Sequence, residues 1–280
     1  HKKNTVKINH FIHSDVKCFF AKFNEKFSFP EWLKTCRKWK NMWPVCLPEY
    51  KIEKKLINQY AFIDIMQKKL KKNSVVVSDA GSSYYVTSQA FQPIKNQRYI
   101  TSGAQADMGF TLPAAIGVAF AQKGKMVVGI TGDGSFQMNI QELQTLVHYK
   151  LPVKLVVWNN NGYLSIRTTQ KKFFSGREIG TDKDSGVSFP STKKIASAYS
   201  IPYFSSKSVN TLKKTLSSAF NTKGPVIIEI FCPPMQEIIP TASSFKLPDG
   251  KMVSKPLEDM YPFLSRDEFN SEMISKPVKE

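Results

Sequence analysis

The sequence predicts an α/β protein with a doubly wound, mostly parallel sheet flanked by helices. Three observations support this fold class. Between about residues 52 and 235, short apolar runs alternate with amphipathic, helix-like stretches, which favours parallel pairing of strands. A chain of 280 residues is long enough to bury a sizeable core. Hydrophobic residues make up 41% of it, and no apolar run approaches the roughly 18 residues of a membrane span.

The predicted elements follow one another in a regular order. The stretch "AFIDIMQKKLKK" (61–72) has the apolar spacing of an amphipathic helix, and "SVVVSDAG" (74–81) is typical of a short buried strand ending in a turn. A helix rich in small residues (109–123) then leads to a second strand, "KMVVGITGDG" (125–134). The remaining elements are a helix, a third strand and a later strand: "NIQELQTLVHYK" (139–150), "VKLVVWNN" (153–160) and "GPVIIEIFC" (224–232).

We expect three parts along the chain. Residues 1–51 are rich in lysine and aromatic residues, with two helix-like stretches, 15–23 and 30–43, that lack a complete core of their own. We interpret them as the remnant of a preceding domain and its linker. Residues 52–235 form the α/β domain. Residues 236–280 are Pro-rich with no clear period, and we expect an extended tail lying over the domain.

Charge and cysteine content narrow the class of protein. The formal net charge is +18, but lysines scattered in pairs carry nearly all of it, so a solvated surface is favoured over nucleic-acid binding. The four cysteines show no CxxC pairing, which indicates free thiols and argues against zinc. The first ten residues contain no apolar segment of a signal peptide. We therefore expect a cytoplasmic protein without a membrane partner.

One carboxylate and one amide point to a shared site. Asp133 follows the strand "VVGIT" on a Gly-flanked turn, and Asn160 follows the strand "KLVVW", 27 residues later. That separation suits a loop, a helix and a strand that return to the same edge of a parallel sheet, where ligands gather. Asp133 and Asn160 should therefore face one pocket.

The donor set predicts the ligand. One carboxylate, one amide oxygen and nearby carbonyls form an oxygen-only site of low charge, which suits Mg²⁺ when a polyphosphate supplies further ligands. Gly132 and Gly134 let the backbone approach an anion closely. The amides of Gly134 and Ser135, at the start of a helix, can donate to a phosphate. The sequence thus predicts a metal-bound diphosphate.

Several stretches, in order, resemble one family. "GDGS" followed by "NNNGY" looks like the thiamine diphosphate motif of the acetolactate synthase-like enzymes. "SDAGSSYY" resembles their first diphosphate loop, "TSGAQADMGFTLPAAIGVAFA" resembles their Gly-rich stretch, and "KPLEDMYPFL" resembles the tail of some members. The resemblance covers roughly residues 52–235 and implies the C-terminal, thiamine diphosphate-binding domain of that family.

The resemblance implies roles for individual residues. Mg²⁺ would be held by Asp133, Asn160 and the main-chain oxygen of Gly162. The backbone near Ala106 would accept from the 4′-amino group of the cofactor, and Met108 would be the apolar wedge that bends it; plain helix core is the alternative for Met108. The diphosphate would be held by two side chains, Ser82 and Ser83, and by four amides: Gly134, Ser135, Tyr163 and Leu164.

Departures from the family pattern bear on the reaction. Ala104 and Ala106 replace usual glycines, and Thr168 and Thr169 stand where acetolactate synthases have "QW", which puts the acetolactate reaction itself in doubt. Ile166 replaces the glutamate of pyruvate-decarboxylase-like enzymes, which favours carboligation. We expect decarboxylation of a 2-oxo acid, with pyruvate as the main candidate, and addition of the two-carbon unit to a second carbonyl compound. A simple 2-oxo acid decarboxylase and a non-catalytic cofactor-binding scaffold are the alternatives.

No catalytic acid or base is assigned within this chain. Family members activate the cofactor with a glutamate from an N-terminal pyrimidine-binding domain, usually of a second subunit, so we expect the chain alone to be inactive. A homodimer or homotetramer is the expected assembly. Whether the full-length protein binds FAD, and whether the acceptor is a 2-oxo acid or a keto-sugar, stays open.

Overall fold

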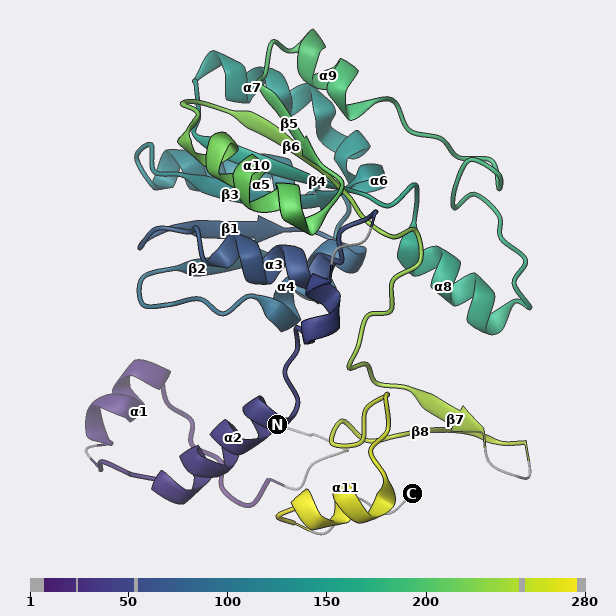
Figure 1. Ribbon diagram of the computed structural model, residues 1–280. Coiled ribbons are helices and arrows are strands. Elements are labelled where there is room, and N and C mark those ends of the chain that lie inside the picture. Colours follow the sequence, from purple (N-terminus) through teal and green to yellow (C-terminus); the bar gives the residue numbers. More distant parts are fainter. Residues whose placement is uncertain (1–7, 24, 53–54, 247–249, 276–280) are drawn as a thin grey trace. The chain divides into compact units, whose positions relative to one another are not determined.

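The computed structural model describes four stretches of the chain: residues 8–23, 25–52, 55–246 and 250–275 (Figure 1). The chain divides into two compact units, His1–Pro44 and Val45–Glu280. In the first unit, helices α1 (Val16–Lys22) and α2 (Pro30–Met42) form where the sequence predicts them, and neither buries a residue.

The three-part division at residues 51 and 235 stays a prediction. Its outermost segments, 1–7 and 276–280, lie outside the described residues.

The second unit is built on a six-stranded sheet in the order β2-β1-β3-β4-β6-β5. Every neighbouring pair in it runs parallel, which confirms the predicted fold class. The sequence predicted the strands with continuous apolar runs and missed two, β2 and β5, which lie at the sheet edges and are only partly buried. The strands are β1 (Val75–Ser78), β2 (Arg98–Thr101), β3 (Val127–Gly132), β4 (Val153–Asn159), β5 (Tyr203–Ser206) and β6 (Val226–Phe231).

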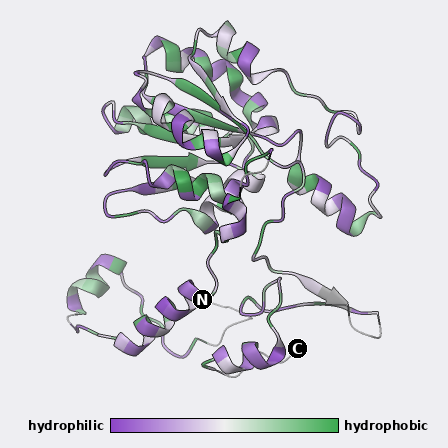
Figure 2. Cartoon of the chain, viewed as in Figure 1, coloured by the Kyte–Doolittle hydropathy of each residue, from purple (hydrophilic) through white to green (hydrophobic). Residues whose placement is uncertain are grey.

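Helices cover both faces of the sheet, because alternate strand side chains point to opposite sides. Val76 packs into one apolar cluster, and its neighbours Val75 and Val77 pack into the other. The first cluster includes helices α3 (Gln59–Gln67), α4 (Gly81–Ala90) and α10 (Val209–Asn221). The second includes helices α5 (Thr111–Ala121), α7 (Leu143–His148) and α9 (Thr192–Ala198). Figure 2 shows the sheet as the apolar centre of this unit.

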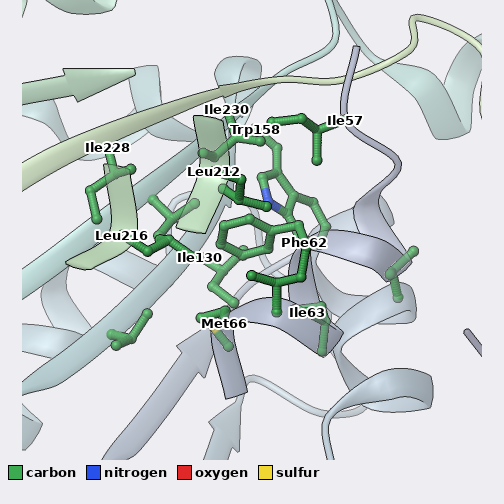
Figure 3. Packing of buried hydrophobic residues seen from close by; sticks show 14 of the residues in the cluster. Ile57, Phe62, Ile63, Met66, Ile130, Trp158, Leu212, Leu216, Ile228 and Ile230 are labelled. Atoms are coloured by element: carbon green, nitrogen blue, oxygen red, sulfur yellow. The ribbon is translucent and has the colours of Figure 1, made fainter. Parts of the chain in front are cut away.

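Trp158 on β4 is the largest fully buried side chain of the first cluster (Figure 3). The ring of Phe62 meets it edge-on, with the ring centroids 5.7 Å apart. The indole nitrogen has no hydrogen-bond partner among the described residues. Trp158 therefore contributes to the core through apolar contact alone.

The tail contains more regular structure than the sequence predicted. Strands β7 (Ser244–Lys246) and β8 (Met252–Ser254) form an antiparallel pair, and helix α11 (Arg266–Glu272) follows them. The prediction of an extended tail did not include these short elements. Helix α11 was missed because it is short and buries only one residue, Phe269, so it has no apolar period.

Two further observations concern the described ranges of the chain. Cys18, Cys36, Cys46 and Cys232 are free thiols. None of the helices there combines the length and the apolarity that a bilayer crossing needs.

Candidate metal and diphosphate site

The carboxyl ends of three strands lie side by side at one edge of the sheet, because β3 pairs with β1 on one side and with β4 on the other. β3 ends at Gly132, and the short helix α6 (Asp133–Phe136) begins at the next residue. β4 ends at Asn159, so Asn160 is the first residue beyond it. The fold therefore brings Asp133 and Asn160 to the ligand-binding edge of the sheet.

Main-chain amides from both loops hold the Asp133 carboxylate. Its Oδ2 atom accepts hydrogen bonds from the amides of Asn160 (3.2 Å) and Gly162 (3.1 Å), and Oδ1 accepts from the amide of Gly134 (2.9 Å). Burial raises the pKa of this carboxyl to about 6, although the three amides and the charge of Arg167 oppose the rise. A cation beside Oδ1 would favour the ionised form and offset the cost of burial.

Two further oxygen-bearing groups, the Asn160 side-chain amide and the main-chain carbonyl of Gly162, converge beside this carboxylate. One terminal atom of the Asn160 side-chain amide lies 3.3 Å from Asp133 Oδ1 and 3.0 Å from the main-chain oxygen of Gly162. If that atom is nitrogen, it donates two hydrogen bonds. If it is oxygen, three acceptors face one another, an arrangement that a cation bound between them stabilises. The Asn160 amide has nearly the same shape in both orientations, so a bound cation can favour the one in which its oxygen faces Asp133 and Gly162.

The spacing of these three atoms fits Mg²⁺. Adjacent ligands of an octahedral Mg²⁺, each about 2.1 Å from the ion, are about 3 Å apart. The Asn160 amide atom lies at about this distance from both Asp133 Oδ1 (3.3 Å) and the main-chain oxygen of Gly162 (3.0 Å), and all three atoms are hard oxygen donors when the amide oxygen faces the other two. No cluster of three or more His, Cys, Asp or Glu side chains suited to a metal occurs in the parts of the chain that the structure describes.

Two glycines at this site are required by packing. A Cβ atom at Gly134 would overlap the ring of Tyr163, and one at Gly162 would overlap the main-chain oxygen of Thr181. Gly162 also has φ of +133°, which side chains disfavour. The sequence pattern had suggested a different reason for Gly134, the approach of an anion. At Gly132 a Cβ atom would meet nothing within 4 Å, so packing does not require glycine there and the approach of an anion remains the expected reason.

The two serines expected at the diphosphate differ in their hydrogen bonds. The Ser83 hydroxyl donates to Asp79 Oδ1 and to the carbonyl of Ala80, both at 2.7 Å, so its proton is committed within the protein. The Ser82 hydroxyl accepts from Gln59 Nε2 at 3.1 Å. This contact leaves the Ser82 proton for another acceptor, and none is found among the described residues. Ser82 is therefore the better placed donor to a phosphate.

The four expected amides also differ. The amide of Gly134 already donates to Asp133, and the amide of Tyr163 donates to Thr181 at 2.8 Å. Leu164 is the first residue of helix α8 (Leu164–Phe173), where helical amides have no acceptor within the helix. Ser135 lies in the first turn of α6. The amides of Ser135 and Leu164 are thus the ones this arrangement leaves for an anion.

Ala106 and Met108 lie in the loop before α5. Ala106 has φ of +50°, a left-handed conformation that glycine adopts without strain. This explains why the family pattern has glycine there. Met108 is 37% exposed and belongs to neither apolar cluster, so the alternative that it is plain helix core is wrong.

Arg167 is a functional residue that was not predicted from the sequence. It is buried on α8, and its guanidinium donates to the main-chain oxygens of Asn160 (3.0 Å) and Asn161 (3.1 Å). It also donates to Pro234 O at 2.7 Å and pairs with Asp182 at 3.2 Å. Arg167 therefore fixes the loop that carries the candidate ligands. A sequence signal existed, since it is one of only five arginines and follows the Asn cluster by a few residues.

A cavity of about 560 Å³ adjoins this loop, with Asp133, Asn161 and Asp182 in its wall. Glu229 also lines it, but its carboxylate already accepts hydrogen bonds from Asn159 (2.8 Å) and from the hydroxyl of Tyr203. The free space therefore borders one of the candidate metal ligands, Asp133, and Glu229 holds β4 and β5 to β6.

A parallel sheet with oxygen donors beside two helix starts at the carboxyl ends of its strands is typical of proteins that bind a diphosphate. Comparison with known families identifies the particular one. The family model described as "Thiamine pyrophosphate enzyme, C-terminal TPP binding domain" matches residues 79–230. The chain belongs to this family of thiamine pyrophosphate enzymes.

Three of the similar proteins are acetolactate synthase large subunits. The acetolactate synthase large subunit of Porphyra purpurea is 30% identical over 198 residues, which cover 71% of this chain and 32% of the relative. That of Pyropia yezoensis is 30% identical over 211 residues, covering 73% and 35%. That of Buchnera aphidicola is 36% identical over 172 residues, covering 61% and 29%. The chain thus spans about a third of the length of these curated relatives.

Proposed function

We propose that this chain is the diphosphate- and Mg²⁺-binding part of a thiamine diphosphate-dependent carboligase. Such an enzyme decarboxylates a 2-oxo acid, here pyruvate, and adds the two-carbon unit to a second carbonyl compound. The single observation that carries the proposal is the convergence of Asp133, Asn160 and Gly162 with the spacing of Mg²⁺ ligands. The name of the relatives, acetolactate synthase, supports the same class of reaction.

The chain's own residues would bind and orient the cofactor. Asp133, Asn160 and the main-chain oxygen of Gly162 would hold Mg²⁺. The Ser82 hydroxyl and the amide of Ser135 would donate to the phosphates, and the amide of Leu164 would do the same at the start of α8. When bound, thiamine diphosphate supplies the nucleophilic carbon and the electron sink of the reaction.

The loop before α5 would set the shape of the cofactor. The exposed side chain of Met108 is free to pack between its two rings, and the main-chain oxygen of Ala106 can accept from the 4′-amino group. A side chain between the rings would hold that amino group close to the reacting carbon, so its contribution would be to position the reacting groups.

Carboligation is favoured over simple decarboxylation by the residue at position 166. Release of an aldehyde needs an acid that protonates the intermediate, and pyruvate-decarboxylase-like enzymes carry a glutamate where this chain has Ile166. Ile166 is 44% exposed on α8, and its side chain has no proton to give. The acceptor is a second 2-oxo acid or a keto-sugar.

The remaining expectations belong to the whole protein. The pyrimidine-binding domain with the activating glutamate would come from outside this chain, from a second subunit of a homodimer or homotetramer. The chain alone would then be inactive. A cytoplasmic location also remains a prediction.

Calorimetric titration of the full-length protein with thiamine diphosphate tests the binding site. We expect binding that depends on Mg²⁺ and that falls by about a hundredfold or more in Asp133→Ala, because Asp133 is the one charged side chain among the proposed protein ligands. Asp184→Ala is the matched control, since Asp184 is an exposed carboxylate that lines the same cavity. Equal affinity in Asp133→Ala and the parent would show that the metal assignment is wrong.

Product analysis with pyruvate tests the reaction class. Acetoin-type or acetolactate-type products are expected, and acetaldehyde as the main product would favour the simple decarboxylase. Cofactor binding without decarboxylation of any 2-oxo acid would favour the scaffold.

A further inference from the structure

Asp79 is a fully buried carboxylate directly after β1. It accepts four hydrogen bonds of 2.7–3.0 Å. Oδ1 accepts from the amide of Ala80 and the hydroxyl of Ser83, and Oδ2 accepts from the hydroxyls of Thr131 and Ser135. Ala80 and Ser83 follow β1, whereas Thr131 lies near the end of β3 and Ser135 lies just beyond it in α6. One carboxylate therefore ties together the chain segments at the ends of two neighbouring strands.

A third segment is tied to the same carboxylate through Ser135. The Ser135 hydroxyl donates to Asp79 at 3.0 Å and accepts from the amide of Gly109 at 2.9 Å. The carbonyl of Gly109 accepts from Asn139 Nδ2 at 3.0 Å, so both main-chain groups of this residue are held. Gly109 directly follows Met108. The position of Met108 is thus linked to Asp79 through a single side chain.

These contacts also decide which hydroxyls remain for a ligand. The protons of Ser83 and Ser135 point to Asp79, so neither can donate to a phosphate. Ser82 keeps its proton, and Gln59, which is fully buried, holds the Ser82 oxygen from the other side.

We propose that Asp79 is the positioning residue of the cofactor site. It touches neither metal nor phosphate in this role. It fixes the segments at the ends of β1 and β3 and the loop that carries Met108 in one arrangement, so that the Ser135 amide and the Met108 side chain face the cofactor together. The expected effect of Asp79 on cofactor binding rests on the proposed function, whereas its expected effect on the loops does not.

The test uses three variants of the full-length protein: Asp79→Asn, Ser135→Ala and the double variant. An asparagine amide has only one acceptor atom, and the main-chain amide of Ala80 at the Oδ1 position can only donate, so the oxygen is needed there. The NH2 group then faces Thr131 and Ser135, whose hydroxyls lose their acceptor. Asp259→Asn is the matched control, because Asp259 is also buried and is held at 2.8 and 2.9 Å by Arg266 in the tail.

The first measurement is hydrogen–deuterium exchange of the Gly109 amide in the protein without added cofactor. We expect exchange to be faster by about tenfold in Asp79→Asn and in Ser135→Ala, and unchanged in Asp259→Asn. Unchanged exchange in Asp79→Asn overturns the proposal whether or not the protein binds thiamine diphosphate. If Asp79→Asn does not fold, unchanged exchange in Ser135→Ala overturns it equally.

The second measurement is the affinity for thiamine diphosphate with Mg²⁺, by calorimetry. Each single variant should bind about tenfold more weakly, and the double variant no more weakly than the worse single one, because both changes break one chain of contacts. Losses that multiply in the double variant would show that Asp79 does not act through Ser135. A parent that binds no thiamine diphosphate refutes the proposed function, and the exchange of the Gly109 amide alone then decides whether Asp79 holds the loops.

Discussion

Arg167 donates to the main-chain oxygen of Asn160 at 3.0 Å, while the amide of the same asparagine donates to Asp133 at 3.2 Å. Asn160 is therefore held on both sides, by a buried cation and by a buried carboxylate. Asp133 and Arg167 are the two ends of one chain of hydrogen bonds, and Asn160, itself a candidate metal ligand, lies between them.

Replacing Arg167 by methionine should lower the free energy of unfolding by about 2–4 kcal/mol, because several main-chain oxygens lose their donor and Asp182 loses its partner. Lys171→Met is the control: Lys171 pairs with Glu178 at 3.3 Å but is half exposed, so its loss should cost at most about 0.5 kcal/mol. Urea unfolding of both variants measures the difference. Similar small losses would contradict the role given to Arg167.

Gly162→Ala should be far more damaging than Gly124→Ala. Both glycines have positive φ, but a Cβ atom at Gly162 overlaps Thr181, whereas one at Gly124 meets nothing within 4 Å. We expect a loss of about 1 kcal/mol for Gly124→Ala, from backbone strain alone, and of more than about 3 kcal/mol for Gly162→Ala. Thermal unfolding compares the two. Equal losses would mean that the loop around Thr181 moves aside at little cost.

Ala106→Gly should raise the free energy of unfolding by up to about 1 kcal/mol, because glycine removes the strain of a left-handed alanine. Ala104→Gly, two residues earlier, should lower it by about 0.5–1 kcal/mol, since Ala104 is outside the set of positive-φ residues found in the described ranges. Urea unfolding distinguishes the opposite signs. A loss in both variants would show that Ala106 is not strained in solution.

Lys154 should contribute a stability that increases between pH 8 and pH 10. Burial lowers the pKa of this lysine from 10.5 to about 8. In this range the unfolded chain binds the proton that the folded chain has lost, so the free energy of unfolding increases with pH. Below about pH 8 both states are charged, and the cost of burying the charge is fully present.

The measurement compares the parent with Lys154→Met, which lacks this titration. The variant also loses the hydrogen bonds that the ammonium donates to the carbonyls of Thr222 and Gly224. Between pH 8 and pH 10 the parent should gain about 1–3 kcal/mol relative to the variant. If the difference in free energy of unfolding between parent and variant is constant from pH 8 to pH 10, Lys154 does not titrate in this range.

The pairing of Asp133 with Asn160 could be predicted from the sequence because it depends only on local information. Each residue follows an apolar run that forms a buried strand, and a crossover between parallel strands returns the chain to the same sheet edge. The outcome is the 3.3 Å contact between their side chains.

The partners of Arg167 and Asp79 could not be predicted in the same way. Arg167 contacts Pro234, which is 67 residues away, and Asp79 contacts Ser135, which is 56 residues away. Such contacts depend on how distant segments pack, not on any local pattern. The Asp79–Ser83 contact had a local signal, because Asp79 directly precedes the N-cap of α4 and Ser83 lies in the first turn of that helix.

The unpaired indole of Trp158 gives the protein a built-in optical probe. Its apolar surroundings should shift its fluorescence emission to shorter wavelengths than that of Trp32 and Trp43, which are 51% and 37% exposed in the first unit. Because Trp158 lies on the strand that leads to Asn160, loss of the short-wavelength emission would report the melting of the sheet without any attached label.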